Sequence, residues 1–158
     1  FLAHEILRPG FMLARLTLRH GAPRLRRRRG GGIARGDHAR DQGRWDLAAR
    51  HYRQALEQMP TAPAIWVQYG HALKESGELA AAEAAYRRAI ALDPQMADTY
   101  LQLGHALKLQ GRPEEAAAAY AACLARDPAS SHAQSELAAL GWTGERIAGL
   151  GGAITVPQ

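Results

Sequence analysis

Histidine and lysine side chains recur in this sequence at a spacing that could serve binding or chemistry. The segment Gly-His-Ala-Leu-Lys at residues 70–74 is repeated 34 residues later, at residues 104–108. If both copies are helical, residues three and four positions apart share one face of the helix. An apolar residue, a histidine and a lysine then form one line in each copy: Val67, His71 and Lys74 in the first, and Leu101, His105 and Lys108 in the second. Histidine and lysine both favour anionic partners such as carboxylates and phosphates.

No arrangement typical of an active site accompanies these lines. The pair Asp37-His38, the four serines, the glycine run at residues 30–32 and the triplet Arg-Gly-Asp at residues 35–37 stand alone. None of them has the spacing of a phosphate-binding loop, a nucleophile elbow or a clustered acid pair. We therefore predict that the chain is not an enzyme, and that any catalytic region would lie outside it.

The single cysteine, Cys123, limits the choice further. One cysteine cannot form a disulfide framework, and with scattered histidines it does not make a Cys/His metal site. Nothing cationic is fixed beside it in the sequence, so we interpret it as a small buried side chain rather than a reactive thiol. We expect no metal and no cofactor.

The 34-residue spacing extends well beyond the two histidines. Equivalent pairs include Trp66 and Tyr100, Gly77 and Gly111, Ala82 and Ala116, Tyr86 and Tyr120, and the Asp-Pro dipeptides at 93–94 and 127–128. One further period upstream, Gly36, Gly43, Ala48, Tyr52 and Pro60 occupy corresponding places. The chain therefore holds three copies, at roughly 29–62, 63–96 and 97–130, which predicts a stacked-repeat architecture.

Each copy predicts two helices joined by a tight turn. Trp66, Tyr69, Gly70 and Leu73 fall at i, i+3, i+4 and i+7, which makes one buried stripe on a first helix at about 64–76. Glycine after that helix permits the left-handed conformation that a reversal of the chain needs. We expect helix pairs near 33–59, 64–93 and 98–127. The glycine run at 30–32 is expected to fray the first helix of the first copy.

A further helix is predicted after the third copy, at about 131–140. Ser131 followed by Gln134 is typical of a capping box, and Gly141 supplies a stop. Solenoids expose an apolar face at each end, so we expect this helix to cover the third copy with Leu137 and Leu140. Residues 141–158 form a glycine-rich tail.

The ordered pattern Trp/Tyr, Leu-Gly, Leu, Gly, Ala, Tyr, Ala-Leu, Pro on a 34-residue period resembles the tetratricopeptide repeat. The resemblance covers about 100 of the 158 residues. It implies an all-α fold, a right-handed superhelical solenoid of antiparallel helix pairs. It also implies that the first helices line a concave groove, and that His71, Lys74, His105 and Lys108 face it. The first copy places Ile33, Asp37 and Arg40 on the same line.

Two glutamines lie beside this line. Gln68 and Gln102 stand where superhelices similar to that of the O-linked N-acetylglucosamine transferase carry an asparagine ladder that grips peptide backbone. The resemblance thus implies a groove that binds an extended, acidic peptide through these residues: Val67, Gln68, His71, Lys74, Leu101, Gln102, His105 and Lys108. Because unperturbed histidine has a pKa of about 6.5, we expect affinity for an anionic ligand to rise as pH falls from about 7.5 to 6.

Two other interpretations stay open. Lysine and histidine can simply be tolerated on a solvated face that recently duplicated repeats share. The repeats also resemble, more weakly, those that accompany bacterial glycosyltransferase or methyltransferase regions. In that case the chain would be an accessory segment of a larger enzyme, and the groove would position an acceptor or a partner subunit. The chain begins with Phe1, so we expect it to be a fragment.

Positive charge is concentrated at the N-terminus. Residues 1–35 carry nine arginines and one glutamate, a net charge of +8, whereas residues 36–158 carry eleven basic and fourteen acidic side chains, a net charge of −3. We interpret residues 1–30 as a basic linker or cap whose polyanion-binding residues are Arg26, Arg27, Arg28 and Arg29.

The same segment has an apolar part, which allows a second interpretation. Phe11, Met12, Leu13, Leu16 and Leu18 could lie on an anionic membrane surface. Nucleic acid is a less favoured partner, because no aromatic residue is interleaved with the arginines to stack on bases. No apolar run approaches the roughly 18 residues of a membrane span, and we expect a cytoplasmic protein.

Overall fold

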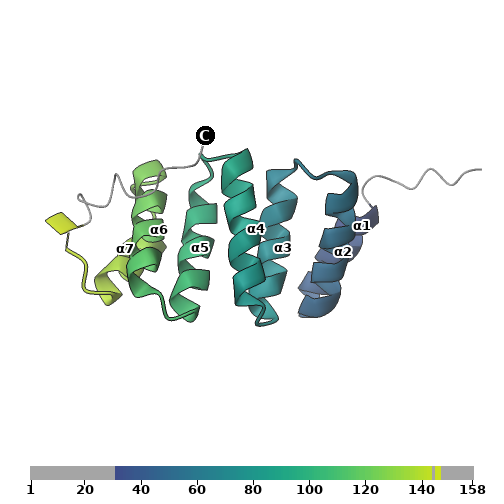
Figure 1. Cartoon of the computed structure of the whole chain (residues 1–158), viewed down its shortest axis with the longest axis horizontal. Coiled ribbons are helices and arrows are strands. Elements are labelled where there is room, and N and C mark those ends of the chain that lie inside the picture. The colour runs from purple at the N-terminus through teal and green to yellow at the C-terminus, as the bar shows by residue number, and fades with distance from the viewer. Residues whose placement is uncertain (1–30, 144, 147–158) are drawn as a thin grey trace, which may run out of the picture.

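The computed structural model describes residues 31–143, 145 and 146 of the chain. These residues form seven helices and no strand. The helices are α1 (Gly31–Asp41), α2 (Trp45–Gln58), α3 (Pro63–Glu75), α4 (Leu79–Leu92), α5 (Ala97–Leu109), α6 (Pro113–Arg126) and α7 (Ser131–Ala139). Figure 1 shows them standing side by side in one elongated row. The predicted all-helical solenoid is confirmed, and the predicted helix ends are correct to within one or two residues.

Contacts between helices follow the order of the chain. The most extensive ones lie within the pairs α1–α2, α3–α4 and α5–α6, and the next most extensive join each pair to the one after it. Helix α7 packs on α6. Each repeat thus buries its apolar surface against its neighbours only, which is the behaviour of a solenoid.

Glycine ends each first helix, as predicted for Gly77 and Gly111. Their φ angles are +87° and +73°, a left-handed conformation that costs glycine little. One hydrogen bond closes each of these two turns. The Glu78 N–H donates to the Leu73 carbonyl (2.9 Å), and the Arg112 N–H donates to the Leu107 carbonyl (3.0 Å). This pattern satisfies helix carbonyls that would otherwise lack donors.

A glycine on the first helix and a tyrosine on the second hold each pair together. A Cβ atom built on Gly36, Gly70 or Gly104 would lie 2.6, 2.8 or 2.4 Å from the nearest ring carbon of Tyr52, Tyr86 or Tyr120 respectively. All three tyrosines have no exposed surface. Side chains essentially never approach so closely, so the tyrosine ring occupies the space that only glycine leaves free.

The expected buried stripe on the first helices is only partly confirmed. Gly70 and Leu73 are buried, but Trp66 and Tyr69 are half-buried. They form the floor of a shallow, largely apolar groove between α2 and α4. In the third copy the equivalent Tyr100 is fully buried, and the guanidinium group of Arg126 lies 4.0 Å from its ring centre.

The first helix of the first copy is formed, contrary to the expectation that glycines would fray it. Helix α1 begins at Gly31 and includes Gly32. A Cβ atom on Gly32 would lie 3.3 Å from the Ala55 Cβ atom on α2. Gly32 therefore permits a close approach of α1 and α2. At the equivalent position the second copy has Trp66, whose large side chain does not permit it.

Helix α7 covers the third copy as expected, but its cap differs. Ala133 and Leu137 are fully buried, and Leu140 packs against the core. The N-cap residue is Ser130 rather than Ser131, and its hydroxyl accepts a hydrogen bond from the Ala133 N–H (3.4 Å). The predicted capping box is therefore wrong: the N-cap lies one residue earlier, and its N3 residue, Ala133, has no polar side chain that could return the hydrogen bond.

Several sequence predictions lie outside the described residues. They concern residues 1–30, including Arg26, Arg27, Arg28 and Arg29, and most of the glycine-rich tail. Within the described part of the chain, no helix has the length and apolar character needed to cross a bilayer. Cys123 is buried, as predicted, and burial raises the pKa of its thiol.

We predict that Gly70→Ala lowers the free energy of unfolding by about 1–3 kcal/mol, because the added methyl group must displace the Tyr86 ring. Chemical denaturation of the two proteins measures this difference. Gly31→Ala is the control, since its Cβ atom would meet nothing closer than the Arg35 Nη2 atom at 3.8 Å. A Gly70 variant as stable as the wild type would show that the two helices do not touch there.

Candidate functional site

Three basic residues at equivalent positions connect successive repeats. Arg40, Lys74 and Lys108 lie on α1, α3 and α5, and we call them the cation row. Each donates a hydrogen bond to the residue 28 positions later, on the first helix of the next unit. The acceptors are Gln68 for Arg40 (3.0 Å), Gln102 for Lys74 (3.1 Å) and Glu136 on α7 for Lys108. The structure thus brings the predicted lysines and glutamines together on one face.

The cation row is more extensively paired than the sequence suggested. Arg40 also contacts Asp37 (3.3 Å) and Asp41 (3.0 Å). The Lys74 side chain is only 10% exposed, and its ammonium group lies 3.6 Å from Glu75. The alternative interpretation, a lysine merely tolerated on a solvated face, therefore does not describe Lys74. Because the recorded bonds of Gln68 and Gln102 use the side-chain oxygen, their amide NH₂ groups remain as donors.

The two predicted histidines lie on the same face but are half-buried. The His71 ring meets Trp45 edge to face at 5.4 Å between ring centres, and the His105 ring meets Tyr120 at 5.6 Å. Burial lowers the pKa of both histidines below the ordinary value, and the nearby Lys74 ammonium group lowers it further. The expected gain of charge between pH 7.5 and 6 is therefore smaller than for an unperturbed histidine, because both rings protonate at lower pH.

The apolar members of the predicted lines serve the core. Leu101 is buried, and Val67 is half-buried against the core. They support the face but offer a ligand little surface. Leu109 lies beside Lys108 in the sequence, and its large apolar side chain is 60% exposed. The sequence analysis did not single it out.

The hydroxyl groups of the helix-pairing tyrosines differ between repeats. The Tyr52 hydroxyl donates to the Asp37 carboxylate at 2.7 Å. In the second and third repeats a histidine replaces this aspartate, and the buried Tyr86 and Tyr120 hydroxyls have no hydrogen-bond partner among the described residues. Burial raises the pKa of both tyrosines, so the hydroxyls stay protonated and can donate. A buried polar group without a partner costs stability and calls for an explanation.

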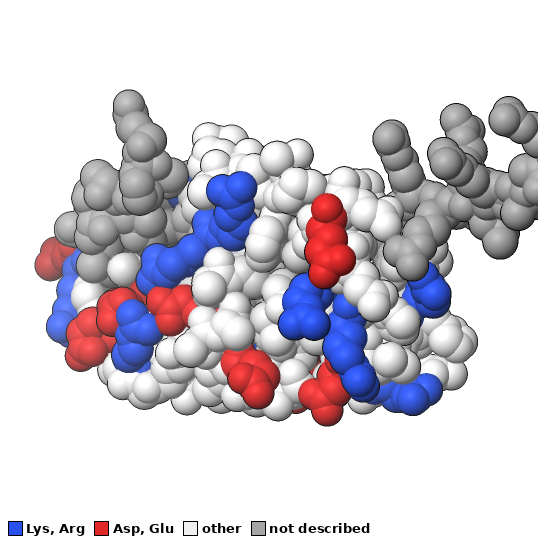
Figure 2. Space-filling model, turned by 45° about the vertical axis from the view of Figure 1, so that its right-hand side comes forward, with Lys and Arg blue, Asp and Glu red and all other residues white. Residues whose placement is uncertain are grey.

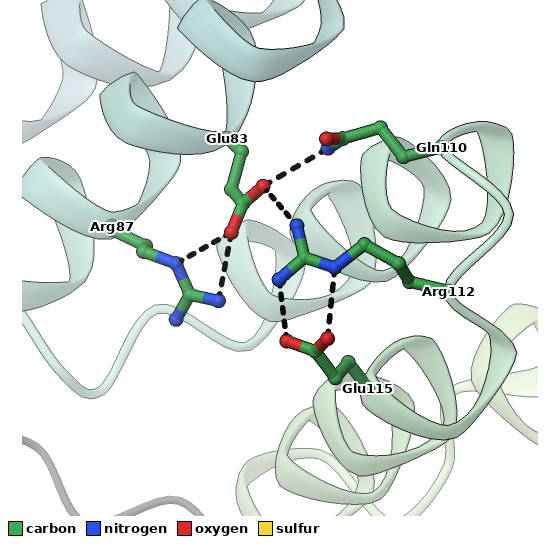
Figure 3. Close-up of polar contacts among 5 residues, drawn as sticks. All are labelled: Glu83, Arg87, Gln110, Arg112 and Glu115. Atoms are coloured by element: carbon green, nitrogen blue, oxygen red, sulfur yellow. Dashed lines mark hydrogen bonds and ion pairs between the residues drawn. The ribbon is translucent and has the colours of Figure 1, made fainter.

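A second polar cluster lies between α4 and the turn from α5 to α6, and it joins the second and third repeats (Figure 3). The Glu83 carboxylate accepts hydrogen bonds from Arg87 (3.0 Å), Gln110 (3.0 Å) and Arg112 (2.7 Å), and Arg112 also pairs with Glu115. Burial alone would raise the pKa of Glu83, but these donors outweigh it and lower that pKa. Sequence reasoning could have found the Glu83–Arg87 pair from its i,i+4 spacing, but not the contacts across repeats.

Charges of both signs are interspersed on one face of the molecule. On the face drawn in Figure 2, Lys and Arg side chains lie among Asp and Glu side chains, without a large patch of one sign. In the described part of the chain, no group of three or more His, Cys, Asp or Glu residues is placed to hold a metal ion.

Sequence comparison identifies the repeat. Three family profiles match: one described as "TPR repeat" at residues 70–111, and two described as "Tetratricopeptide repeat" at residues 39–88 and 97–140. Together they span residues 39–140. The comparison with curated proteins finds no match.

Solved structures of such domains are similar to this chain. The first TPR of Spaghetti (RPAP3), bound to the HSP90 peptide SRMEEVD, has a TM-score of 0.67 and 24% identity, over 70% of this chain and 87% of that one. The Arabidopsis OM64 TPR domain has a TM-score of 0.69 and 22% identity, over 72% and 93%. The Sgt2 TPR domain from Aspergillus fumigatus has a TM-score of 0.67 and 21% identity, over 72% and 76%.

We predict that Glu83→Gln lowers the free energy of unfolding by about 1–2 kcal/mol, because a side chain that is 13% exposed loses its charge in front of two arginines. Urea denaturation at pH 7 measures the change. Glu114→Gln, on an exposed position of α6, is the control and should change stability by less than about 0.5 kcal/mol. Equal effects of the two substitutions would contradict a stabilising role for the cluster.

The lowered pKa values of the two half-buried histidines predict a loss of stability in weak acid. Their pKa values are lowered only in the folded chain, so the unfolded chain binds more protons once pH falls below about 6.5. The stability that they contribute is present above that pH and is lost as pH falls toward their folded values. Urea midpoints at pH 7.5 and 5.5 should therefore differ less for His71→Gln/His105→Gln than for the wild type.

His132→Gln, at an exposed position of α7, is the control for this measurement. It should keep the pH dependence of the wild type. A double variant with the wild-type pH dependence would show that the two half-buried rings do not contribute to it.

Proposed function

Because this chain belongs to the tetratricopeptide repeat family, we propose that it is an interaction module that binds an extended segment of another protein. The segment would lie along the face of α1, α3 and α5, which the family resemblance assigns to the concave groove. The observation that supports this most directly is the cation row with its glutamine partners. It presents cations and amide donors at regular intervals along one face.

Regular spacing suits a polypeptide in extended conformation. An extended chain offers backbone carbonyl and amide groups at every residue, so the amide NH₂ groups of Gln68 and Gln102 can meet them whatever the side chains are. Some structures of similar fold are peptide complexes: the first TPR of Spaghetti carries an HSP90 peptide, and the second TPR domain of human RPAP3 carries the HSP70 peptide SGPTIEEVD. That shared architecture supports a peptide as the class of ligand.

An acidic preference is the finer part of the proposal. A ligand carboxylate can displace the neutral oxygen of Gln68 or Gln102 from its basic partner, and the exchange strengthens the interaction because the acceptor becomes charged. At Lys108 the ligand would have to displace Glu136, which is already charged. We therefore expect acidic side chains to be favoured near Arg40 and Lys74 rather than near the C-terminal end of the face.

We predict that Lys74→Ala/Lys108→Ala weakens the binding of acidic peptides by about 1 kcal/mol, and more at low salt than at high salt. Fluorescence titration of an acidic peptide library against the full chain measures this. Arg50→Ala/Arg88→Ala removes two exposed arginines from α2 and α4 and is the matched control for charge. If both double variants weaken binding equally, the effect depends only on net charge. The proposal that the peptide binds this face would then be wrong.

Other functional interpretations stay predictions from the sequence. They are the polyanion-binding role of residues 1–30, the membrane-surface contact, a cytoplasmic location, and the accessory segment of a larger enzyme. Each concerns residues outside the described part of the chain, the location of the protein in the cell, or its place in a larger enzyme.

A further inference from the structure

We propose that the groove between α2 and α4 binds a segment of this same chain, the apolar and basic stretch at residues 11–19. The walls of this groove come from second helices, so it is a different surface from the face of α1, α3 and α5 on which a peptide is proposed to lie. The contact would add to the proposed function and does not depend on it.

The groove has an aromatic floor that is open to solvent. Trp66 and Tyr69 of α3 lie there, with their rings edge to face and 6.2 Å between ring centres, and both side chains are half-buried. Apolar side chains from α2 and α4 line the walls: Leu56, Ala81, Ala84 and Ala85. Because aromatic side chains bury much apolar surface when they are covered, an apolar occupant would be stabilising here.

The equivalent floor, one repeat later, is closed. Tyr100 and Leu103 stand at the positions of the two aromatic residues, and they are 0% and 3% exposed. The guanidinium group of Arg126 lies 4.0 Å from the centre of the Tyr100 ring. The same arrangement of helices can therefore bury this floor completely. Its exposure at the boundary between the first and second repeats is a property of the side chains around it.

The polar cluster around Glu83 joins the two walls of the equivalent groove (Figure 3). Its ion pairs connect, in order, Arg87, Glu83, Arg112 and Glu115. One repeat earlier, the two ends of this series correspond to Arg53 and Ala81, and both line the open groove. The three members after the arginine are replaced there, in order, by Ala49, Glu78 and Ala81. The same series of ion pairs therefore cannot form over the open groove.

The charges at the first boundary indicate what an occupant should bring. Arg112 lies between two carboxylates in the cluster around Glu83, whereas Glu78 stands at its position one repeat earlier. The exposed Glu57 also lines the open groove, with Arg53 as its counterpart. An arginine from the occupant would supply the cation that Glu78 has replaced, and a guanidinium group also stacks well on aromatic rings. The occupant should therefore combine apolar side chains with arginine.

Residues 11–19 combine these properties. They read Phe-Met-Leu-Ala-Arg-Leu-Thr-Leu-Arg, with five large apolar side chains and two arginines. Residues 1–35 carry a net charge of +8 and residues 36–158 a net charge of −3, so the two parts of the chain attract each other. The other apolar stretch, at residues 1–7, contains Glu5 and lies farther from the repeats along the chain.

The segment needs only a short connection to reach the groove. Residues 1–30 join the described part of the chain at Gly31, and a Cβ atom on Gly32 would lie 3.3 Å from the Ala55 Cβ atom of α2. The next residue, Leu56, already lines the groove. Residues 20–30 link the segment to Gly31, and an extended chain of that length spans about 35 Å, several times the roughly 10 Å between packed helices. Such a tether keeps the local concentration of the segment on the order of millimolar.

Photo-crosslinking in the full chain tests this contact. The photoreactive amino acid p-benzoylphenylalanine replaces Ala84, which is exposed and lines the groove. After irradiation, mass spectrometry of the one-chain species should find it attached to residues 11–19. The control carries the same amino acid in place of Gln54, which is exposed on α2, does not line the groove and adjoins Ala55 near the start of the tether. Because reach alone would favour the control, we expect a yield at Ala84 about tenfold above it.

Leu13→Asp/Leu16→Asp is the decisive variant, and Ile6→Asp/Leu7→Asp is its matched control. Both add two negative charges to residues 1–30 and leave the repeats unchanged. The first should lower the adduct yield at Ala84 about tenfold, because two leucines no longer enter the groove and the new carboxylates would be buried there. The control should keep the wild-type yield.

Ala49→Glu/Glu78→Arg/Ala81→Glu tests the groove itself. Together with Arg53, the new side chains repeat the order of charges around Glu83. They should close the groove and abolish the adduct at Ala84. If this closed-groove variant does not fold, the leucine variant still decides.

Three results would overturn the proposal. A yield at Ala84 no higher than at Gln54 would show that the segment does not dock; if Leu13 and Leu16 are then needed for sedimentation with phosphatidylserine vesicles, their partner is a membrane. Adducts in two-chain species would assign the groove to a second copy. An adduct that persists in the leucine variant, or in a folded closed-groove variant, would show that other residues make it. Peptide binding by the face of the first helices is decided separately, by the acidic peptide titration.

Discussion

The structure depends on the contact between a glycine on one helix and a tyrosine on the next. In every pair the ring lies where a Cβ atom would otherwise be, so the two helices can take only one position relative to each other. Because the contact recurs every 34 residues, the three pairs have the same geometry. A solenoid built from identical pairs repeats any surface group at a constant interval. The regular surface of the molecule is thus a consequence of its interior packing.

The contacts of the cation row follow from this regularity. Lys74 reaches Gln102 and Arg40 reaches Gln68 across the same 28 residues because successive first helices are offset by the same amount. The row also contributes to the solenoid itself, since each contact joins one repeat to the next. Under the proposed function, a cation of this row would have two roles, and a ligand that binds it would compete with a contact between repeats.

The sequence was sufficient to predict the period, the helix pairs, the turn glycines and the covering helix, because each depends on residues close together in the chain. It also placed His71 and Lys74 on one face. It could not predict that Lys74 would be almost buried or that burial would lower the pKa of His71. Those properties depend on the neighbouring repeat. The Glu83 cluster was missed for the same reason, since Arg112 meets it from the following repeat.

The Glu83 cluster has no counterpart one repeat earlier. The two boundaries between repeats are therefore not held by the same polar contacts. Ala49 stands at the position equivalent to Glu83, and Glu78 at the position equivalent to Arg112. The boundary between the first and second repeats therefore lacks the equivalent ion pair. In a chain of nearest-neighbour units, a boundary that lacks such a contact opens more easily in hydrogen exchange and under force than the same boundary with it. A partner that spans all three repeats would hold this boundary closed. Part of its binding free energy would then be spent on suppressing local unfolding, and slow exchange of the α1 amides would report that the partner is bound.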